Sequence, residues 1–204
     1  MKSKPYLLAI FLFICYSFLI SSCEKSSDGY LSSYSADDEI VSSFDDGDDG
    51  WTISGDAQGS SVEPQYNSEL GFIYANDNAT GGVWYFEAPA KYLGDMEAAY
   101  DGKIKFSLKV DLIDSQFDAE DVILEGNNLI IAFDTPNNPG LDWTDYEVVI
   151  SESAGWTINV INGTPATESQ IRSVLSDLTR FRIRGEFRVG YDTGNLNNVE
   201  FPGV

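Results

Sequence analysis

Apolar and polar side chains alternate over one long stretch of the chain, between Lys103 and Leu112. The apolar positions are Ile104, Phe106, Leu108, Val110 and Leu112. A period of two is typical of a β-strand that has one face against a core and the other in water. The pattern therefore predicts a half-buried strand over residues 103–112.

Shorter apolar segments, bounded by Gly, Asn, Asp or Pro, occur along most of the chain. They lie at residues 41–44, 51–53, 72–75, 83–86, 122–124, 129–133, 146–150 and 156–161. An Asp-Gly turn separates the first two, which is typical of two strands joined by a tight loop. Many short strands separated by turn residues predict an all-β sandwich.

One short helix interrupts this pattern. Thr167 and Gln170 have the spacing of a capping box. Apolar residues then recur at helical spacing, at Ile171, Val174, Leu175 and Leu178. A strand follows at 181–189, with a predicted dry face of Phe181, Ile183, Phe187 and Val189 and a wet face of Arg180, Arg182, Arg184, Glu186 and Arg188.

The N-terminus has the pattern of a lipoprotein signal. Two lysines precede an apolar run at 7–20, and Ser21 and Ser22 lead into Cys23. This pattern predicts a signal peptide at 1–22 and a lipid on Cys23; an ordinary signal peptide or an uncleaved anchor is the alternative. Residues 23–40 are predicted to be an acidic, Ser-rich tether and 41–204 a single domain. Acidic residues after Cys23 resemble export signals of Gram-negative lipoproteins, which implies a location in the cell envelope, outer membrane or cell surface.

Composition excludes several classes of function. The 204 residues carry 12 basic and 33 acidic side chains, and removing residues 1–22 takes away two of the basic ones and none of the acidic ones. Such an acidic chain is a poor partner for nucleic acid, whose binding depends on Lys and Arg. Residues 23–204 hold no His and a single Cys, so disulfides, Ser-His-Asp or Cys-His catalysis and His-ligated zinc are excluded there.

The sequence resembles the laminin IV (laminin B) domain family. The first motifs in the family's order are Trp84, Pro89, Tyr92, Leu93, Gly94, Asp95, Tyr100, Gly102 and Ile104. Residues 121–127, 146–156, 171–187 and 196–199 resemble its later motifs, with Asn197 in the place of an acid. The resemblance implies a jelly-roll sandwich like that of carbohydrate-binding modules, in an extracellular protein without catalytic activity.

The acidic run at 45–49 is a candidate calcium site. Carboxylates in a Gly-containing turn supply the oxygen ligands that Ca²⁺ requires. Asp45, Asp48 and the nearby Asp56 are the predicted ligands in this part of the chain. The resemblance implies a structural Ca²⁺ between the first and last strands, which adds Asn198 and Glu200. The alternative is a solvated acidic turn.

Two predicted strand faces carry most of the basic residues. Lys103, Lys105 and Lys109 alternate on one strand, and Arg182, Arg184 and Arg188 on another. Such clusters suggest a site for an anionic polysaccharide or sulfated glycan. In the alternative interpretation, acids on intervening strands neutralise both faces.

Trp143 is the candidate for stacking against a sugar ring, because Asn, Pro, Gly and Asp surround it in a loop-like segment. Trp84 lies beside Tyr85 and Phe86 and is predicted to belong to the core.

The predicted function is that of a membrane-anchored surface lipoprotein whose β-sandwich binds an extracellular glycan or matrix component without catalysis. A protein-binding adhesion or structural module is the first alternative. A glycosidase that uses two carboxylates is the second.

Overall fold

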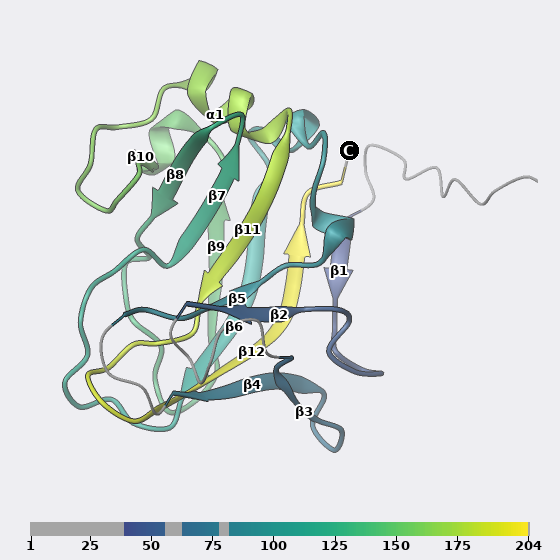
Figure 1. The fold of residues 1–204 in the computed structure, drawn as a ribbon, viewed down its shortest axis with the longest axis vertical. Helices are drawn as coiled ribbons and strands as arrows, with labels where there is room; N and C mark the ends of the chain where they lie inside the picture. Colours follow the sequence, from purple (N-terminus) through teal and green to yellow (C-terminus); the bar gives the residue numbers. More distant parts are fainter. Residues whose placement is uncertain (1–38, 56–62, 78–81, 204) are drawn as a thin grey trace, which may run out of the picture. The chain divides into compact units, whose positions relative to one another are not determined.

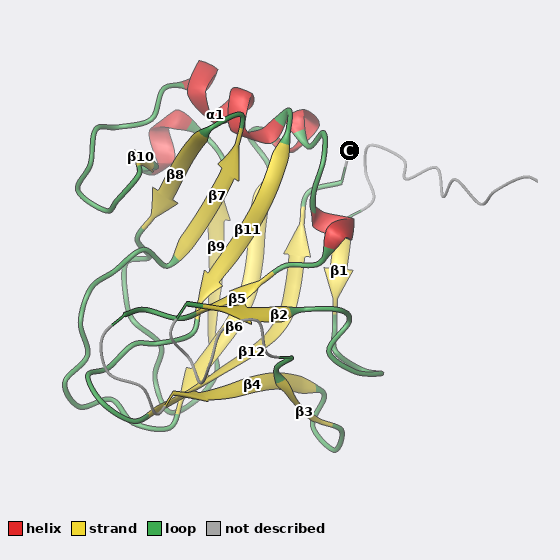
Figure 2. Cartoon of the chain, viewed as in Figure 1, coloured by secondary structure: helices red, strands yellow, loops and turns green. Residues whose placement is uncertain are grey.

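The computed structural model describes residues 39–55, 63–77 and 82–203. The chain divides into two units, Met1–Ser33 and Tyr34–Val204, and every described residue belongs to the second. Two antiparallel sheets dominate this unit (Figure 1), and its helical segments gather mainly at one end of the strands (Figure 2).

The first sheet is organised around the longest strand, β12. Its order is β3 (Gln65–Asn67), β4 (Phe72–Asp77), β12 (Asp192–Phe201), β6 (Lys103–Val110) and β9 (Thr144–Val149), and β1 (Ile40–Ser42) also pairs with β12. The predicted strand at 103–112 is thus confirmed as β6, with an end at Val110.

The second sheet covers the other side of the core. Its order is β10 (Thr157–Ile158), β8 (Leu129–Phe133), β7 (Val122–Gly126), β11 (Leu178–Arg184), β5 (Tyr85–Glu87) and β2 (Thr52–Ser54). The apolar cluster of buried side chains includes Trp51, Trp84 and Trp156, each with no exposed surface. The predicted all-β jelly-roll sandwich is confirmed, and so is the burial of Trp84.

The predicted helix is also confirmed, as α1 (Glu168–Leu175). Thr167 caps it: the Thr167 hydroxyl accepts from the Gln170 backbone N–H, and the Gln170 side chain accepts from the Thr167 N–H. Within the described residues, three short 3₁₀ helices accompany α1, at Ala90–Tyr92, Glu97–Ala99 and Glu152–Ala154.

The predicted strand, loop and strand at 41–53 are present as β1 and β2, but the two strands do not pair with each other. β1 pairs with β12 in the first sheet, whereas β2 pairs with β5 in the second. Phe44 and Trp51, near the two ends of the connecting loop, are both buried and their ring centroids are 6.2 Å apart. The loop therefore crosses from one sheet to the other with its apolar residues in the shared core.

The predicted faces of the strand at 181–189 are wrong in part beyond Ile183, because β11 ends at Arg184; Phe187 is buried as predicted. Val189 is 68% exposed although it was predicted to be buried, and Arg184 is 0% exposed although it was predicted to face water. Glu186, also predicted on the wet face, is buried as well.

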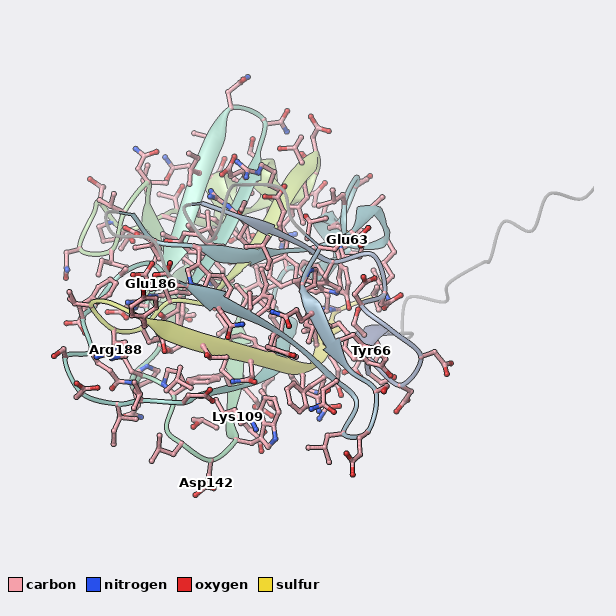
Figure 3. The ribbon with its side chains drawn as sticks, turned by 60° about the horizontal axis from the view of Figure 1, so that its bottom comes forward. Glu63, Tyr66, Lys109, Asp142, Glu186 and Arg188 are labelled. Atoms are coloured by element: carbon pink, nitrogen blue, oxygen red, sulfur yellow. The ribbon has the colours of Figure 1, made fainter. Side chains whose placement is uncertain are left out.

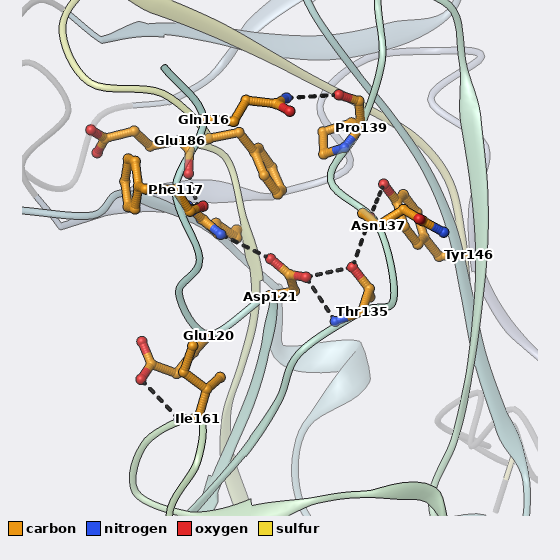
Figure 4. Close-up of polar contacts among 12 residues, drawn as sticks. Gln116, Phe117, Glu120, Asp121, Thr135, Asn137, Pro139, Tyr146, Ile161 and Glu186 are labelled. Carbon is orange, nitrogen blue, oxygen red and sulfur yellow. Dashed lines mark hydrogen bonds and ion pairs between the residues drawn. The ribbon is translucent and has the colours of Figure 1, made fainter. Parts of the chain in front are cut away.

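A buried ion pair explains the position of Arg184. Its Nη1 lies 3.2 Å from Asp121 Oδ1, and its Nη2 donates to the Phe117 carbonyl at 2.8 Å. The other Asp121 oxygen accepts from the Thr135 backbone N–H and hydroxyl (Figure 4). Burial raises the pKa of the Asp121 carboxyl, against the lowering effects of Thr135 and Arg184. The guanidinium is therefore paired and hydrogen-bonded, as a buried charge requires.

Candidate ligand-binding face

Aromatic side chains and a lysine meet on the outer face of the first sheet. Tyr74 on β4 pairs with Asn195 on β12, and Asn195 pairs with Lys109 on β6. Phe72 lies two residues before Tyr74, and Trp143 immediately precedes β9, the neighbour of β6. We call Phe72, Tyr74, Lys109 and Trp143 the platform.

The platform is held together by contacts between its rings and the lysine. The Phe72 and Trp143 ring centroids are 5.4 Å apart, although β12 and β6 separate β4 from β9 in the sheet. Lys109 Nζ lies 4.9 Å from the Phe72 centroid and 5.1 Å from the Trp143 centroid. Each such cation–π contact contributes about 0.5–1 kcal/mol at an exposed site. Trp143 remains 38% exposed, so one ring of the platform is accessible to solvent.

Amides and hydroxyls lie around the rings. The Tyr74 hydroxyl donates to Gln65 Oε1 at 3.0 Å, and the Thr193 hydroxyl donates to Asn76 Oδ1 at 2.9 Å. The Asn195 side-chain amide donates to the Lys109 carbonyl at 3.1 Å. The face thus combines flat apolar surface with neutral donors and acceptors, the combination that binds sugar rings and their hydroxyls.

An open pocket of about 400 Å³ continues this face at one end of β12. Its lining residues are Asn76, Asp77, Asp111, Leu112, Tyr191, Asp192 and Thr193. Burial raises the pKa of the Asp192 carboxyl, which accepts hydrogen bonds from the backbone N–H groups of Phe187 and Thr193.

Ion pairs neutralise most of the basic residues on the two predicted faces, as the alternative interpretation expects. Lys105 contacts Glu39 and Glu200, and Arg182 contacts Glu125 on the neighbouring strand β7. Among the nine Lys and Arg residues in the described part of the chain, Lys109 is the one without a carboxylate within 4.0 Å; the others are Lys91, Lys103, Lys105, Arg172, Arg180, Arg182, Arg184 and Arg188.

The structure does not gather the predicted glycan ligands into one site. Trp143 is exposed on the platform, whereas Lys105 and Arg182 are held in ion pairs and Arg184 is buried in the interior. Arg188 binds Asp114 and the carbonyl of Tyr191, so it holds a loop together.

The predicted calcium ligands that lie within the described residues likewise do not form one group. Asp45 accepts from Ser43, and Asp48 accepts from the backbone N–H of Gly50. Glu200 is ion-paired with Lys105, Asn198 lies in a bulge of β12, and Asp56 falls outside the described residues. No three His, Cys, Asp or Glu residues within 39–55, 63–77 and 82–203 form a group able to hold a metal.

Calcium binding therefore stays a prediction of the sequence, which thermal unfolding can test. If Ca²⁺ binds, the protein should have a higher melting temperature in Ca²⁺ than in chelator, because a ligand bound only to the folded state stabilises that state. Replacing Asp45 and Asp48 with Asn should remove the difference. Equal melting temperatures of the unaltered protein in Ca²⁺ and chelator would eliminate the site.

Phe72, Tyr74 and Tyr191 were not predicted as site residues, and Lys109 was predicted only as part of a basic cluster for an anionic glycan. Phe72 and Tyr74 lie in a strand that the sequence does predict, and Lys109 lies in the alternating segment. Their shared face is visible only when the neighbours of each strand are known. Figure 3 labels Lys109 together with Asp142, whose side chain points away from the protein at the tip of the loop before β9.

The model of the family Laminin B (Domain IV) matches residues 85–202. The chain belongs to the laminin B family. It is 31% identical over 188 residues to laminin subunit gamma-2 of Equus caballus and 30% identical over 178 residues to laminin subunit gamma-1 of Homo sapiens. These stretches cover 88% and 85% of this chain, but only 14% and 10% of the two relatives.

Two solved structures share the fold of this laminin B domain. The L4b domain of human laminin alpha-2 has a TM-score of 0.64 at 13% identity, over 81% of this chain and 98% of that one. The family 11 carbohydrate-binding module of the cellulase Lic26A-Cel5E of Clostridium thermocellum has a TM-score of 0.51 at 17% identity, over 83% and 97% of the two chains. Both likenesses concern the fold alone.

The predicted signal peptide, Cys23 and nearly all of the predicted tether lie outside the described residues. In the part of the chain that the structure describes, no helix is both long and apolar enough to cross a membrane.

Proposed function

We propose that this laminin B domain binds an extracellular glycan without catalysis, on the outer face of its first sheet. The observation that carries the proposal is the platform itself. Trp143 presents a partly exposed ring whose position is fixed by Phe72 and Lys109, and neutral amides and hydroxyls lie on strands β3, β4 and β12 of the same sheet. A fixed aromatic surface binds a sugar at a small cost in side-chain entropy.

The comparisons support a binding role. A module named for carbohydrate binding has the same fold, and the relatives include the basement membrane-specific heparan sulfate proteoglycan core protein of Mus musculus, 28% identical over 172 residues. A secreted or surface location suits such relatives. We include the lipid on Cys23 in the proposal as the membrane anchor of the domain, on the strength of the N-terminal sequence.

Replacing Trp143 with Ala should lower glycan affinity about tenfold or more, because the stacking surface is lost. The measurement is binding of the purified protein to an array of neutral and anionic polysaccharides, followed by titration of those that bind. Trp143→Phe should keep most of the affinity because a ring remains.

Leu141→Ala is the matched control, since Leu141 is an exposed apolar residue of the same loop. It should bind as the unaltered protein does. If the Trp143→Ala variant binds the glycan with the same affinity as the unaltered protein, the platform is not the binding face. Absence of binding to every polysaccharide, by protein shown to be folded, would contradict glycan binding and favour a protein partner.

A further inference from the structure

We infer that the binding face continues into the pocket beside Tyr191 and that the site takes a neutral glycan, with one sugar ring on Tyr191 and its hydroxyls donating to Asp111. This inference rests on the proposed function. It adds a second subsite and a chemical class of ligand.

The register of the sheet makes the platform and the pocket continuous. Tyr74 pairs with Asn195, and two residues further along the same strands Asn76 pairs with Thr193. Asn76 and Thr193 line the pocket, and they are joined by a side-chain hydrogen bond of 2.9 Å. Two residues of a strand span about 7 Å. A glycan lying across the platform therefore reaches the pocket without leaving the sheet.

Tyr191 presents an exposed ring on a fixed backbone. Tyr191 is 73% exposed, while its carbonyl accepts a hydrogen bond from Arg188. The Arg188 guanidinium is itself ion-paired with Asp114 at 3.1 Å. On the other side, Asp192 accepts from the backbone N–H of Phe187 at 2.9 Å. A single exposed aromatic residue needs no explanation by itself. At the rim of a polar pocket, on a backbone held from both sides, it is a prepared stacking surface.

The charge of the pocket selects against anionic sugars. Its described lining contains three aspartates and no basic side chain. Asp77 and Asp192 are buried, whereas Asp111 is exposed. A carboxylate accepts hydrogen bonds from sugar hydroxyls and repels sulfate and carboxylate groups. Lys109 is the only described basic residue of the platform, and its amino group lies 4.9 Å and 5.1 Å from the centroids of two rings. The site therefore favours a neutral chain rich in hydroxyls.

The test uses purified protein and two sets of probes in 0.15 M salt. The neutral set consists of cello-oligosaccharides, xylan, mannan and laminarin, and the anionic set of heparin and alginate. We expect binding to at least one neutral probe and none to the anionic probes. Tyr191→Ala should weaken neutral binding about tenfold. Asp111→Asn should weaken it by a smaller factor, because an amide oxygen still accepts hydrogen bonds.

Matched controls lie far from the pocket. Val160→Ala removes an exposed apolar side chain elsewhere, and Asp101→Asn changes an exposed aspartate beyond the opposite end of β6. Neither should alter binding. If the Tyr191→Ala and Asp111→Asn variants keep full affinity for the neutral glycan while Trp143→Ala loses it, the pocket is not part of the binding site. The proposed function would not be affected.

The remaining outcomes also separate the two proposals. If heparin or alginate binds as tightly as the neutral probes, and Trp143→Ala abolishes this binding, the ligand is not restricted to neutral glycans. The platform would then still be the binding face. If the folded protein binds none of the probes, both proposals are wrong.

Discussion

Replacing Arg184 with Met is expected to lower the free energy of unfolding by about 3–5 kcal/mol, the usual cost of removing one partner of a buried ion pair. Arg184 is 0% exposed, and its guanidinium donates to Asp121 and to two backbone carbonyls. The substitution leaves a buried carboxylate without its counter-charge and two carbonyls without donors. The measurement is the midpoint and slope of chemical unfolding.

A double variant measures how much of the lost stability comes from the unpaired Asp121 carboxylate. Adding Asp121→Asn to Arg184→Met should recover part of the lost stability, because the unpaired carboxylate is removed while Thr135 keeps an acceptor. Arg172→Met is the matched control: Arg172 forms an exposed ion pair with Glu168 on α1, and its loss should cost no more than about 1 kcal/mol. An Arg184→Met variant as stable as this control would show that the buried pair contributes no more than a surface pair.

The same ion pair bears on the candidate site. Arg184 binds the carbonyls of Phe117 and Glu186, which lie in the loops after β6 and β11. The Phe117 N–H donates to the Phe187 carbonyl, and further along the two loops Arg188 binds Asp114. Loss of Arg184 should therefore also loosen the loop that carries Tyr191.

Gly185→Ala is expected to cost about 3 kcal/mol or more, because the site has no room for a methyl group. A Cβ on Gly185 would lie 1.9 Å from a ring atom of Trp84, and one on Gly194 would lie 2.9 Å from the same ring. Trp84 has no exposed surface, and its ring centroid is 5.0 Å from that of Phe86. The ring cannot move aside without disturbing the core. Thermal and chemical unfolding measure the loss.

Gly140→Ala is the control for this variant. The φ of Gly140 lies outside the left-handed region, and the nearest atom to a Cβ at this position is 3.9 Å away. The substitution should therefore change the free energy of unfolding very little. Combining Gly185→Ala with Trp84→Leu should be less damaging than the sum of the two changes, because the smaller side chain makes room for the methyl group. Simple additivity would argue against the steric explanation.

Local patterns in the sequence determined the elements themselves. The alternation at 103–112 predicted β6, and the capping box at Thr167 predicted the start of α1. β7 and β8 are joined by Asn127 and Asn128, both with positive φ, a conformation that Asn adopts readily. The motifs of the laminin B family supplied the jelly-roll expectation. The alternation, the capping box and the Asn-Asn turn each depend on residues close together in the chain, and each family motif is itself a short segment, so the sequence was sufficient.

Only the tertiary structure decided which side chains meet. Trp143 was predicted as a sugar-stacking residue, but its contacts with Phe72 and Lys109 join residues that are far apart in sequence. The period of two predicted that Arg184 faces water. Arg184 is instead buried, and its ion pair with Asp121, 63 residues away in the sequence, compensates the buried charge. A period of two specifies two faces of a strand without specifying what covers each face. That depends on strand pairing and on the neutralisation of charge across the sheets, which are properties of the folded chain.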